Sequence, residues 1–121
     1  MRTTNLFILR GYVGNAPKQF NKTTKVSVAT RRLGQRDQVS GKREEHTDWV
    51  EVTILNEKTA EWVFKNVKSG DPIYAECRVR SSSYKDKNTG DMVYGTDVIA
   101  YLFDLLAPSA KDDDGRYDDR D

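Results

Sequence analysis

Two stretches of this sequence place aromatic and basic side chains where they could contact a ligand. In residues 48–54, aliphatic side chains alternate with a polar face, and Trp49 lies on that polar face. In residues 73–84, an apolar face alternates with a face that carries two arginines and ends in Tyr84. Aromatic rings stack on bases and arginines pair with phosphates, so this combination predicts binding of single-stranded nucleic acid. The alternative is that both rings pack under loops or in a subunit contact.

The alternation itself indicates β-strands, because successive side chains of a strand point to opposite faces. In the second stretch, Ile73, Ala75, Cys77 and Val79 form the apolar face, which we expect to pack into a core. Cys77 is the only cysteine, so it cannot form a disulfide within the chain. Its position predicts a small core side chain and not a reactive thiol.

The rest of the chain supplies three more strand patterns and one helix pattern. Asn56 is a suitable N-cap for a helix in which Ala60, Val63 and Val67 follow helical spacing, and the segment 68–70 is expected to end it with a glycine. The five predicted strands span residues 6–13, 25–31, 48–55, 73–84 and 93–106. Five strands with one helix between the third and the fourth is the order of the OB-fold, an all-β Greek-key barrel that commonly binds oligonucleotides.

Two connections in this pattern are rich in charge. Residues 31–46 form a polar segment, predicted as a long loop or a flexible hairpin, whose five basic residues outnumber its three acids. Residues 85–92 form a charged turn around Asn88-Thr89-Gly90. Basic side chains in such segments could neutralise phosphates.

The composition predicts one small domain with a large polar surface, since 36% of the 121 residues are hydrophobic and 32% are charged. The net charge of +1 is uneven: residues 111–121 carry −3, which leaves +4 on the first 110. With no aliphatic side chain, residues 111–121 are expected to be disordered. We therefore predict an OB-fold domain at 1–107 and a disordered acidic tail at 108–121. No apolar run could span a membrane and no signal-peptide pattern opens the chain, so we expect a cytoplasmic protein.

Catalysis has little support in the sequence. His46 is the only histidine and lies in a charged segment, so a solvated side chain is a better interpretation than a catalytic base. One histidine and one distant cysteine cannot supply a zinc site of the usual kind. No glycine-rich phosphate loop has nucleotide-binding spacing. We expect a non-enzymatic protein with no cofactor and no metal.

Several motifs resemble those of the bacterial single-stranded DNA-binding proteins, in the same order and over roughly residues 5–103. The matching pieces are residues 5–17 for the opening strand, 28–30 for the second, 47–49 for the entry to the third, 60–61 and Gly70 for the helix, and 76–80 with Tyr84 for the fourth. The resemblance implies an OB-fold subunit that binds single-stranded DNA within a homo-oligomer, usually a tetramer and alternatively a dimer.

The resemblance also implies roles for individual residues. Trp49 and Tyr84 match family positions where aromatic rings stack on bases, and Arg80 matches a basic position beside the strand. The basic residues of segment 31–46 match the family's DNA-wrapping loop in character. The full set predicted to bind DNA is Trp49, Tyr84, Arg80, Arg78, Arg10, Tyr12, Arg31, Arg32, Arg36, Lys85 and Lys87.

The chain also departs from the family pattern. No stacking tryptophan follows the second strand near Leu33, and the family's late third-strand aromatic and fourth-strand glycine correspond here to Leu55 and Cys77. The tail lacks the terminal apolar pair that docks into partner proteins. These departures predict weaker binding or a smaller footprint and little recruitment of replication proteins. An accessory plasmid or phage member is one interpretation.

The function predicted from these observations is sequence-independent binding and protection of single-stranded DNA in replication, recombination or repair. The alternative is an OB-fold protein-interaction subunit, such as a primosome or conjugation accessory, with weak nucleic-acid binding. The pattern does not distinguish DNA from RNA, because stacking does not sense the 2′-hydroxyl. It also leaves open the roles of Trp62 and Phe64, which lie about 200° apart on the predicted helix.

Overall fold

The computed structural model describes residues 1–107 of the chain, and the predicted acidic tail at 108–121 lies outside the described residues. The elements are β1 (Phe7–Val13), β2 (Lys18–Phe20), β3 (Thr23–Arg36), β4 (Arg43–Ile54), α1 (Glu57–Asn66), β5 (Pro72–Lys85) and β6 (Met92–Leu105). Within residues 1–107, no helix is long and apolar enough to cross a membrane.

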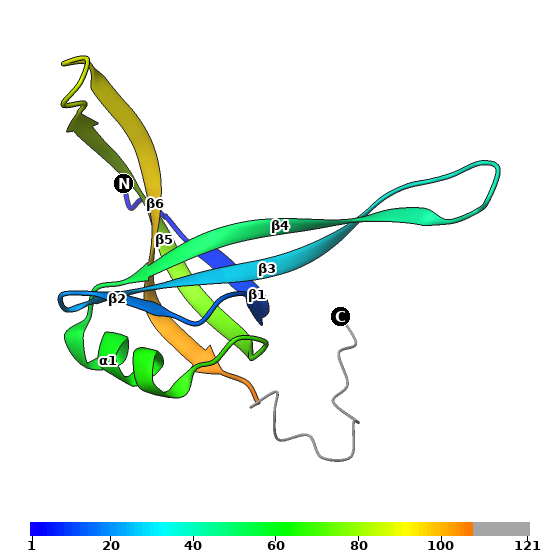
Figure 1. The fold of residues 1–121 in the computed structure, drawn as a ribbon, viewed down its shortest axis with the longest axis horizontal. Coiled ribbons are helices and arrows are strands. Elements are labelled where there is room, and N and C mark those ends of the chain that lie inside the picture. Colours follow the sequence, from blue (N-terminus) through cyan, green and yellow to red (C-terminus); the bar gives the residue numbers. More distant parts are fainter. Residues whose placement is uncertain (108–121) are drawn as a thin grey trace.

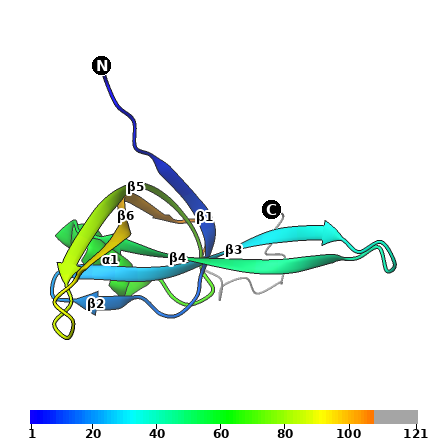
Figure 2. The same ribbon diagram turned by 90° about the horizontal axis from the view of Figure 1, so that it is seen from above.

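Five of these strands close into a barrel. They follow the order β1-β5-β6-β4-β3, and β1 pairs with β3 to complete the ring (Figures 1 and 2). Only the β4–β6 pair is parallel among the strand pairs of the described residues. With α1 inserted before β5, this arrangement confirms the predicted OB-fold. The short strand β2, on the outer edge of β3, was not predicted because its three exposed residues carry no apolar pattern.

Closure of the barrel depends on a glycine in β1. Tyr12 and Val13 at the end of β1 pair with Ala29 and Val28 of β3. A Cβ atom on Gly11 would lie 2.3 Å from the carbonyl oxygen of Ala29, which is far inside van der Waals contact. The two backbones can therefore approach this closely only if residue 11 has no side chain.

The barrel interior is mainly aliphatic, as the alternating patterns predicted. The core includes Val26, Val28, Val52, Ile54, Ile73 and Cys77, all fully buried. Helix α1 packs against β2, β3 and β4 and buries Ala60 and Val63. The buried hydroxyl of Thr24 donates to the carbonyl oxygen of Ala60 at 2.8 Å, so its polar group is satisfied where the helix meets β3.

Helix α1 begins as predicted and ends earlier. The side chain of Asn56 accepts a hydrogen bond from the backbone N–H of Thr59 at 3.1 Å, which is N-cap geometry. The prediction that a glycine ends the helix was wrong. The helix stops at Asn66, and Gly70 adopts its φ of 91° in the turn that leads to β5.

Two hairpins project from the barrel as arms (Figure 1). The β3–β4 arm comprises residues 30–48, and the β5–β6 arm comprises residues 78–98. The segment 31–46 is thus a hairpin whose strands continue to Arg36 and resume at Arg43, longer than predicted. At the end of the other arm, Gly90 lies in the predicted turn with a φ of 77°.

Burial changes where β5 enters its arm. The prediction that Val79 continues the buried face was wrong, because Val79 is 37% exposed whereas Cys77 is buried. At this point β1 has not yet begun, and the side chain of Asn5 pairs with the backbone of Val79 instead. Asn5 accepts from the N–H of Val79 at 2.9 Å and donates to its carbonyl oxygen at 2.7 Å.

Candidate nucleic-acid interface

Trp49 lies on the outer face of the barrel, at the base of the β3–β4 arm. Its cross-strand neighbour in β3 is Ala29, and the neighbour of Ala29 in β1 is Tyr12, so the three residues form one row across the sheet. Trp49 is 60% exposed and Tyr12 is 37% exposed. A Cβ on Gly14 would lie 2.4 Å from the Trp49 ring, so the indole packs over that glycine. Small residues at 14 and 29 leave the remaining ring surface open to a ligand.

Tyr84 lies near the end of the β5–β6 arm and is 64% exposed. Strand alternation puts Arg78 and Arg80 on the same face of β5 as Tyr84. This face therefore has the predicted arrangement of arginines leading to an aromatic ring. Tyr84 lies near the end of the β5–β6 arm, however, whereas Trp49 lies at the base of the β3–β4 arm, and the two arms diverge in Figure 1.

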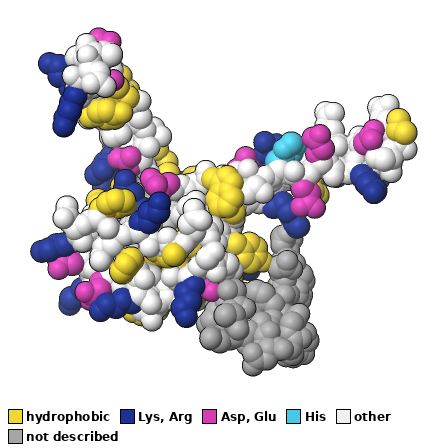
Figure 3. All heavy atoms as spheres, in the orientation of Figure 1, with side chains coloured by type: hydrophobic (Ala, Val, Ile, Leu, Met, Phe, Trp, Pro, Cys, Tyr) yellow, Lys and Arg dark blue, Asp and Glu magenta, His cyan; other side chains and the backbone are white. Residues whose placement is uncertain are grey.

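The predicted basic residues fall into two groups. Three of them contact carboxylates: Arg31 with Glu45 at 3.9 Å, Arg32 with Asp48 at 2.9 Å, and Arg80 with Asp97 at 3.1 Å. The others have no carboxylate within 4.0 Å among residues 1–107, namely Arg10, Arg36, Arg78, Lys85 and Lys87. Figure 3 shows the result as basic and acidic side chains interspersed along both arms.

The end of the β3–β4 arm places two cations opposite each other. Arg36 and Arg43 are direct cross-strand partners, and like charges in this position repel each other. Asp37 is committed to the turn, where its carboxylate accepts from the N–H of Val39 at 3.1 Å and from the hydroxyl of Ser40 at 2.9 Å. The backbone hydrogen bond from Val39, and then the side-chain hydrogen bond from the Ser40 hydroxyl, lower the pKa of Asp37 below its ordinary value. A polyanion bound at this end would relieve the repulsion between the arginines.

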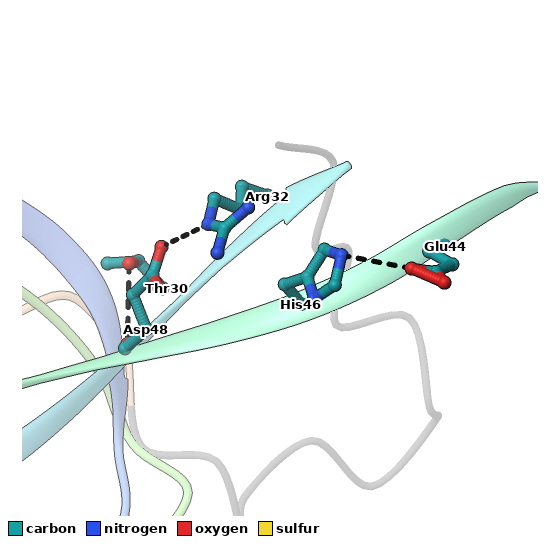
Figure 4. A network of polar contacts seen from close by, with 5 residues as sticks. All are labelled: Thr30, Arg32, Glu44, His46 and Asp48. Carbon is teal, nitrogen blue, oxygen red and sulfur yellow. Dashed lines mark hydrogen bonds and ion pairs between the residues drawn. The ribbon is translucent and has the colours of Figure 1, made fainter. Parts of the chain in front are cut away.

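The structure also places the residues that could act chemically. His46 lies 3.3 Å from Glu44 on the β3–β4 arm, beside the Arg32–Asp48 pair (Figure 4). Burial raises the pKa of the Cys77 thiol to about 11, so this side chain stays protonated in the core at neutral pH. Within residues 1–107, no three histidine, cysteine or acidic side chains gather as metal ligands would.

Two tyrosines of β6 lie on the surface without having been predicted there. Tyr94 is 76% exposed and Tyr101 is 60% exposed. The alternation of Val93, Tyr94 and Gly95 could have indicated the first, whereas Tyr101 is the extra residue of a bulge that shifts the β5–β6 register. On helix α1, Trp62 and Phe64 are 46% and 42% exposed, so neither belongs to the core.

Comparison with known proteins agrees with this fold. The model of the single-strand binding protein family matches residues 4–106. Single-stranded DNA-binding protein 1 of Chlorobaculum tepidum is 30% identical over 118 residues, covering 94% of this chain and 70% of that protein. The single-stranded DNA-binding protein of Bacteroides thetaiotaomicron is 33% identical over 111 residues, covering 88% and 68%.

Among solved structures, the chain is similar to the Plasmodium falciparum SSB in complex with ssDNA. The TM-score is 0.67 at 21% sequence identity, covering 87% of this chain and 95% of that one. This likeness supports the fold, and the family match and the two bacterial relatives support the lineage. The chain belongs to the single-strand binding protein family.

Proposed function

We propose that this protein binds single-stranded DNA without reading its sequence and protects it during replication, recombination or repair. The observation that carries the proposal is the exposure of Trp49 and Tyr84 on strand faces that also present cations. Bacterial relatives that match most of this chain carry the name single-stranded DNA-binding protein.

The mechanism has two parts. Any base offers a π-face to Trp49 or Tyr84, and each stacked base contributes roughly 1–3 kcal/mol. Cations such as Arg36 and Arg78 neutralise phosphates and release counterions from the strand. Neither part depends on the edge of a base, so affinity is expected to vary little with sequence. No bond is made or broken, and the protein acts as a binder in the cytoplasm and not as an enzyme.

The experiment is a fluorescence titration with poly(dT). Because the chain has two tryptophans, Trp49 and Trp62, the titration uses the Trp62→Phe variant, in which the emission comes from Trp49 alone. We expect strong quenching on binding, a midpoint that moves with salt, and much weaker binding of duplex DNA of equal length. A poly(U) titration measures the preference between DNA and RNA.

The same titration separates this proposal from the alternative function. In a protein-interaction subunit with a protein-contacting aromatic face, poly(dT) at low salt would leave the Trp49 emission unchanged. An unchanged emission together with no shift of oligo(dT) in a gel assay would reject single-stranded DNA binding.

A further inference from the structure

We infer that three carboxylates on the arms, Glu45, Asp48 and Asp97, hold arginines that are predicted to bind DNA and thereby limit the affinity of the protein for DNA. This inference rests on the proposed function and adds a determinant of affinity to it. It starts from the observation that three of the predicted phosphate contacts are already engaged by acids within the described chain.

The tightest of these pairs joins Arg32 and Asp48 across the β3–β4 arm. The Arg32 Nε atom donates to the Asp48 carboxylate at 2.9 Å, and Figure 4 shows the two side chains reaching toward each other. The pair is diagonal, because Arg32 is opposite His46 and Asp48 is opposite Thr30. The two side chains are 59% and 49% exposed, so a phosphate from solution can reach the guanidinium.

A second pair joins an arginine and a carboxylate across the β5–β6 arm. Arg80 and Asp97 are direct cross-strand partners, with 3.1 Å between the Arg80 Nη2 atom and the carboxylate. Arg31 and Glu45 form a looser pair at 3.9 Å. In every case the base lies on one strand and the acid on the neighbouring strand, so the pairs are built into the sheet register.

Such an ion pair reduces the net free energy that the arginine gains when it binds a phosphate. A guanidinium prefers the same planar, bidentate contact with carboxylate and with phosphate, so the two anions compete for it. When phosphate displaces the carboxylate, the acid remains near the DNA backbone and takes up a cation from solution. That uptake offsets part of the counterion release that normally drives binding.

The unpaired cations differ in this respect. Arg36 and Arg78 have no carboxylate within 4.0 Å among residues 1–107, so they can contact phosphate without an exchange. Mutation of an unpaired cation and mutation of a paired carboxylate should therefore change the affinity for DNA in opposite directions. Removing an unpaired cation should weaken binding, whereas removing a carboxylate should strengthen it by releasing its arginine.

The test is a double-mutant cycle on binding of oligo(dT) at low salt, with Asp48→Asn, Arg32→Gln and the double variant. Exposed ion pairs of this kind correspond to about 1.4- to 5-fold in an equilibrium constant. We expect Asp48→Asn to tighten binding by a factor in that range and to steepen the salt dependence. In the Arg32→Gln background the same change should have almost no effect.

Two further variants control for charge and for folding. Glu61→Gln makes the same change in net charge but releases only Lys65 on α1, so it should leave binding nearly unchanged. The Asp97→Asn and Arg80→Gln cycle repeats the test on the other arm, in case the first pair is needed for folding. Melting temperature and circular dichroism are recorded for every variant.

The inference would be overturned if Asp48→Asn raised the affinity for oligo(dT) equally with and without Arg32, or if Glu61→Gln raised it as much. Either result would show that the effect comes from net charge alone. No gain in either cycle would overturn it as well. If the unmodified protein fails to bind oligo(dT), it is the proposed function that fails, so the two failures are distinguishable.

Discussion

At the scale of single residues, Trp49 packs against Gly14 and is also proposed to stack on a base. Its ring packs over Gly14, and the residue as a whole is 60% exposed. We expect Trp49→Ala to weaken binding of oligo(dT) by roughly 1–3 kcal/mol through the lost stacking. The lost packing against Gly14 should also lower the melting temperature, so affinity is measured below the transition and per folded molecule. Tyr101→Ala is the control, because Tyr101 is equally exposed but is not part of the proposed surface. Unchanged affinity for Trp49→Ala would make this tryptophan structural.

Tyr84 offers a sharper comparison, because the same arm carries a second tyrosine on its other face. Tyr84 pairs with Val93, whereas Tyr94 pairs with Ser83, so the two rings lie on opposite sides of the hairpin. Only the Tyr84 side also carries Arg78 and Arg80. We expect Tyr84→Ala to weaken binding by roughly 1–3 kcal/mol and Tyr94→Ala to have little effect, as measured by fluorescence titration. A larger loss from Tyr94→Ala would place the DNA path on the other face.

The sequence predicted the exposure of Trp49 and Tyr84 because strand alternation is a local property. It could not predict that Asp48 contacts Arg32, because that contact depends on the pairing register of two strands that are sixteen residues apart at this point. It also misjudged Val79, since alternation assigns a side chain to a face but does not say where the barrel stops covering that face. Local pattern thus predicted which rings are exposed, and long-range pairing determined which arginines contact a carboxylate.

At the scale of elements, the end of the β3–β4 arm should account for most of the salt dependence that this arm contributes to DNA binding. Arg36 faces Arg43 and has no carboxylate within 4.0 Å among residues 1–107. We expect Arg36→Gln to reduce the slope of log affinity against log salt by about 0.7, the value for one phosphate contact of a single strand. Arg32→Gln should reduce it less, because Asp48 already neutralises that guanidinium. Equal slopes for Arg36→Gln and the unmodified protein would mean that the arm does not contact phosphate.

The turn of this arm should depend on pH through Asp37. Its hydrogen bonds from Val39 and Ser40 lower its pKa in the folded state below the ordinary value of 3.8. A group with a lowered folded pKa stabilises the fold above its unfolded pKa and loses that effect as the pH falls through the folded value. We therefore expect the Asp37 carboxyl carbon to titrate below 3.8 by NMR, and the Val39 amide signal to shift with it. Titration at or above 3.8 would show that the turn is not closed in solution.

At the scale of the whole molecule, a single added methyl group should destabilise the fold most where β1 closes the barrel against β3. A Cβ on Gly11 would lie 2.3 Å from the Ala29 carbonyl oxygen, so β1 and β3 would have to separate. We expect Gly11→Ala to lower the free energy of unfolding by about 1–3 kcal/mol or more, as overpacked sites do. Gly95→Ala is the matched control on the β5–β6 arm, where the nearest atom, Ser82 Oγ, would be 3.6 Å away. Urea denaturation of both variants measures the difference, and equal stabilities would show that β1 closes onto β3 differently in solution.

Self-association of the whole molecule should involve β1. Because β1 pairs with β3 through Tyr12 and Val13 and lies against it at Gly11, residues 7–10 keep one backbone edge without a strand partner among the described residues. Beside this edge, Leu6 is 52% exposed and Ile8 is 53% exposed. An open edge with apolar side chains favours pairing with a second copy of the chain. We therefore expect a homo-oligomer in solution, and we expect Ile8→Glu to shift it toward the monomer while leaving the barrel folded. Light scattering with size-exclusion chromatography measures the mass, with Ile8→Val as the conservative control. A monomeric unmodified protein, or an oligomer that survives Ile8→Glu unchanged, would show that this edge is not the contact.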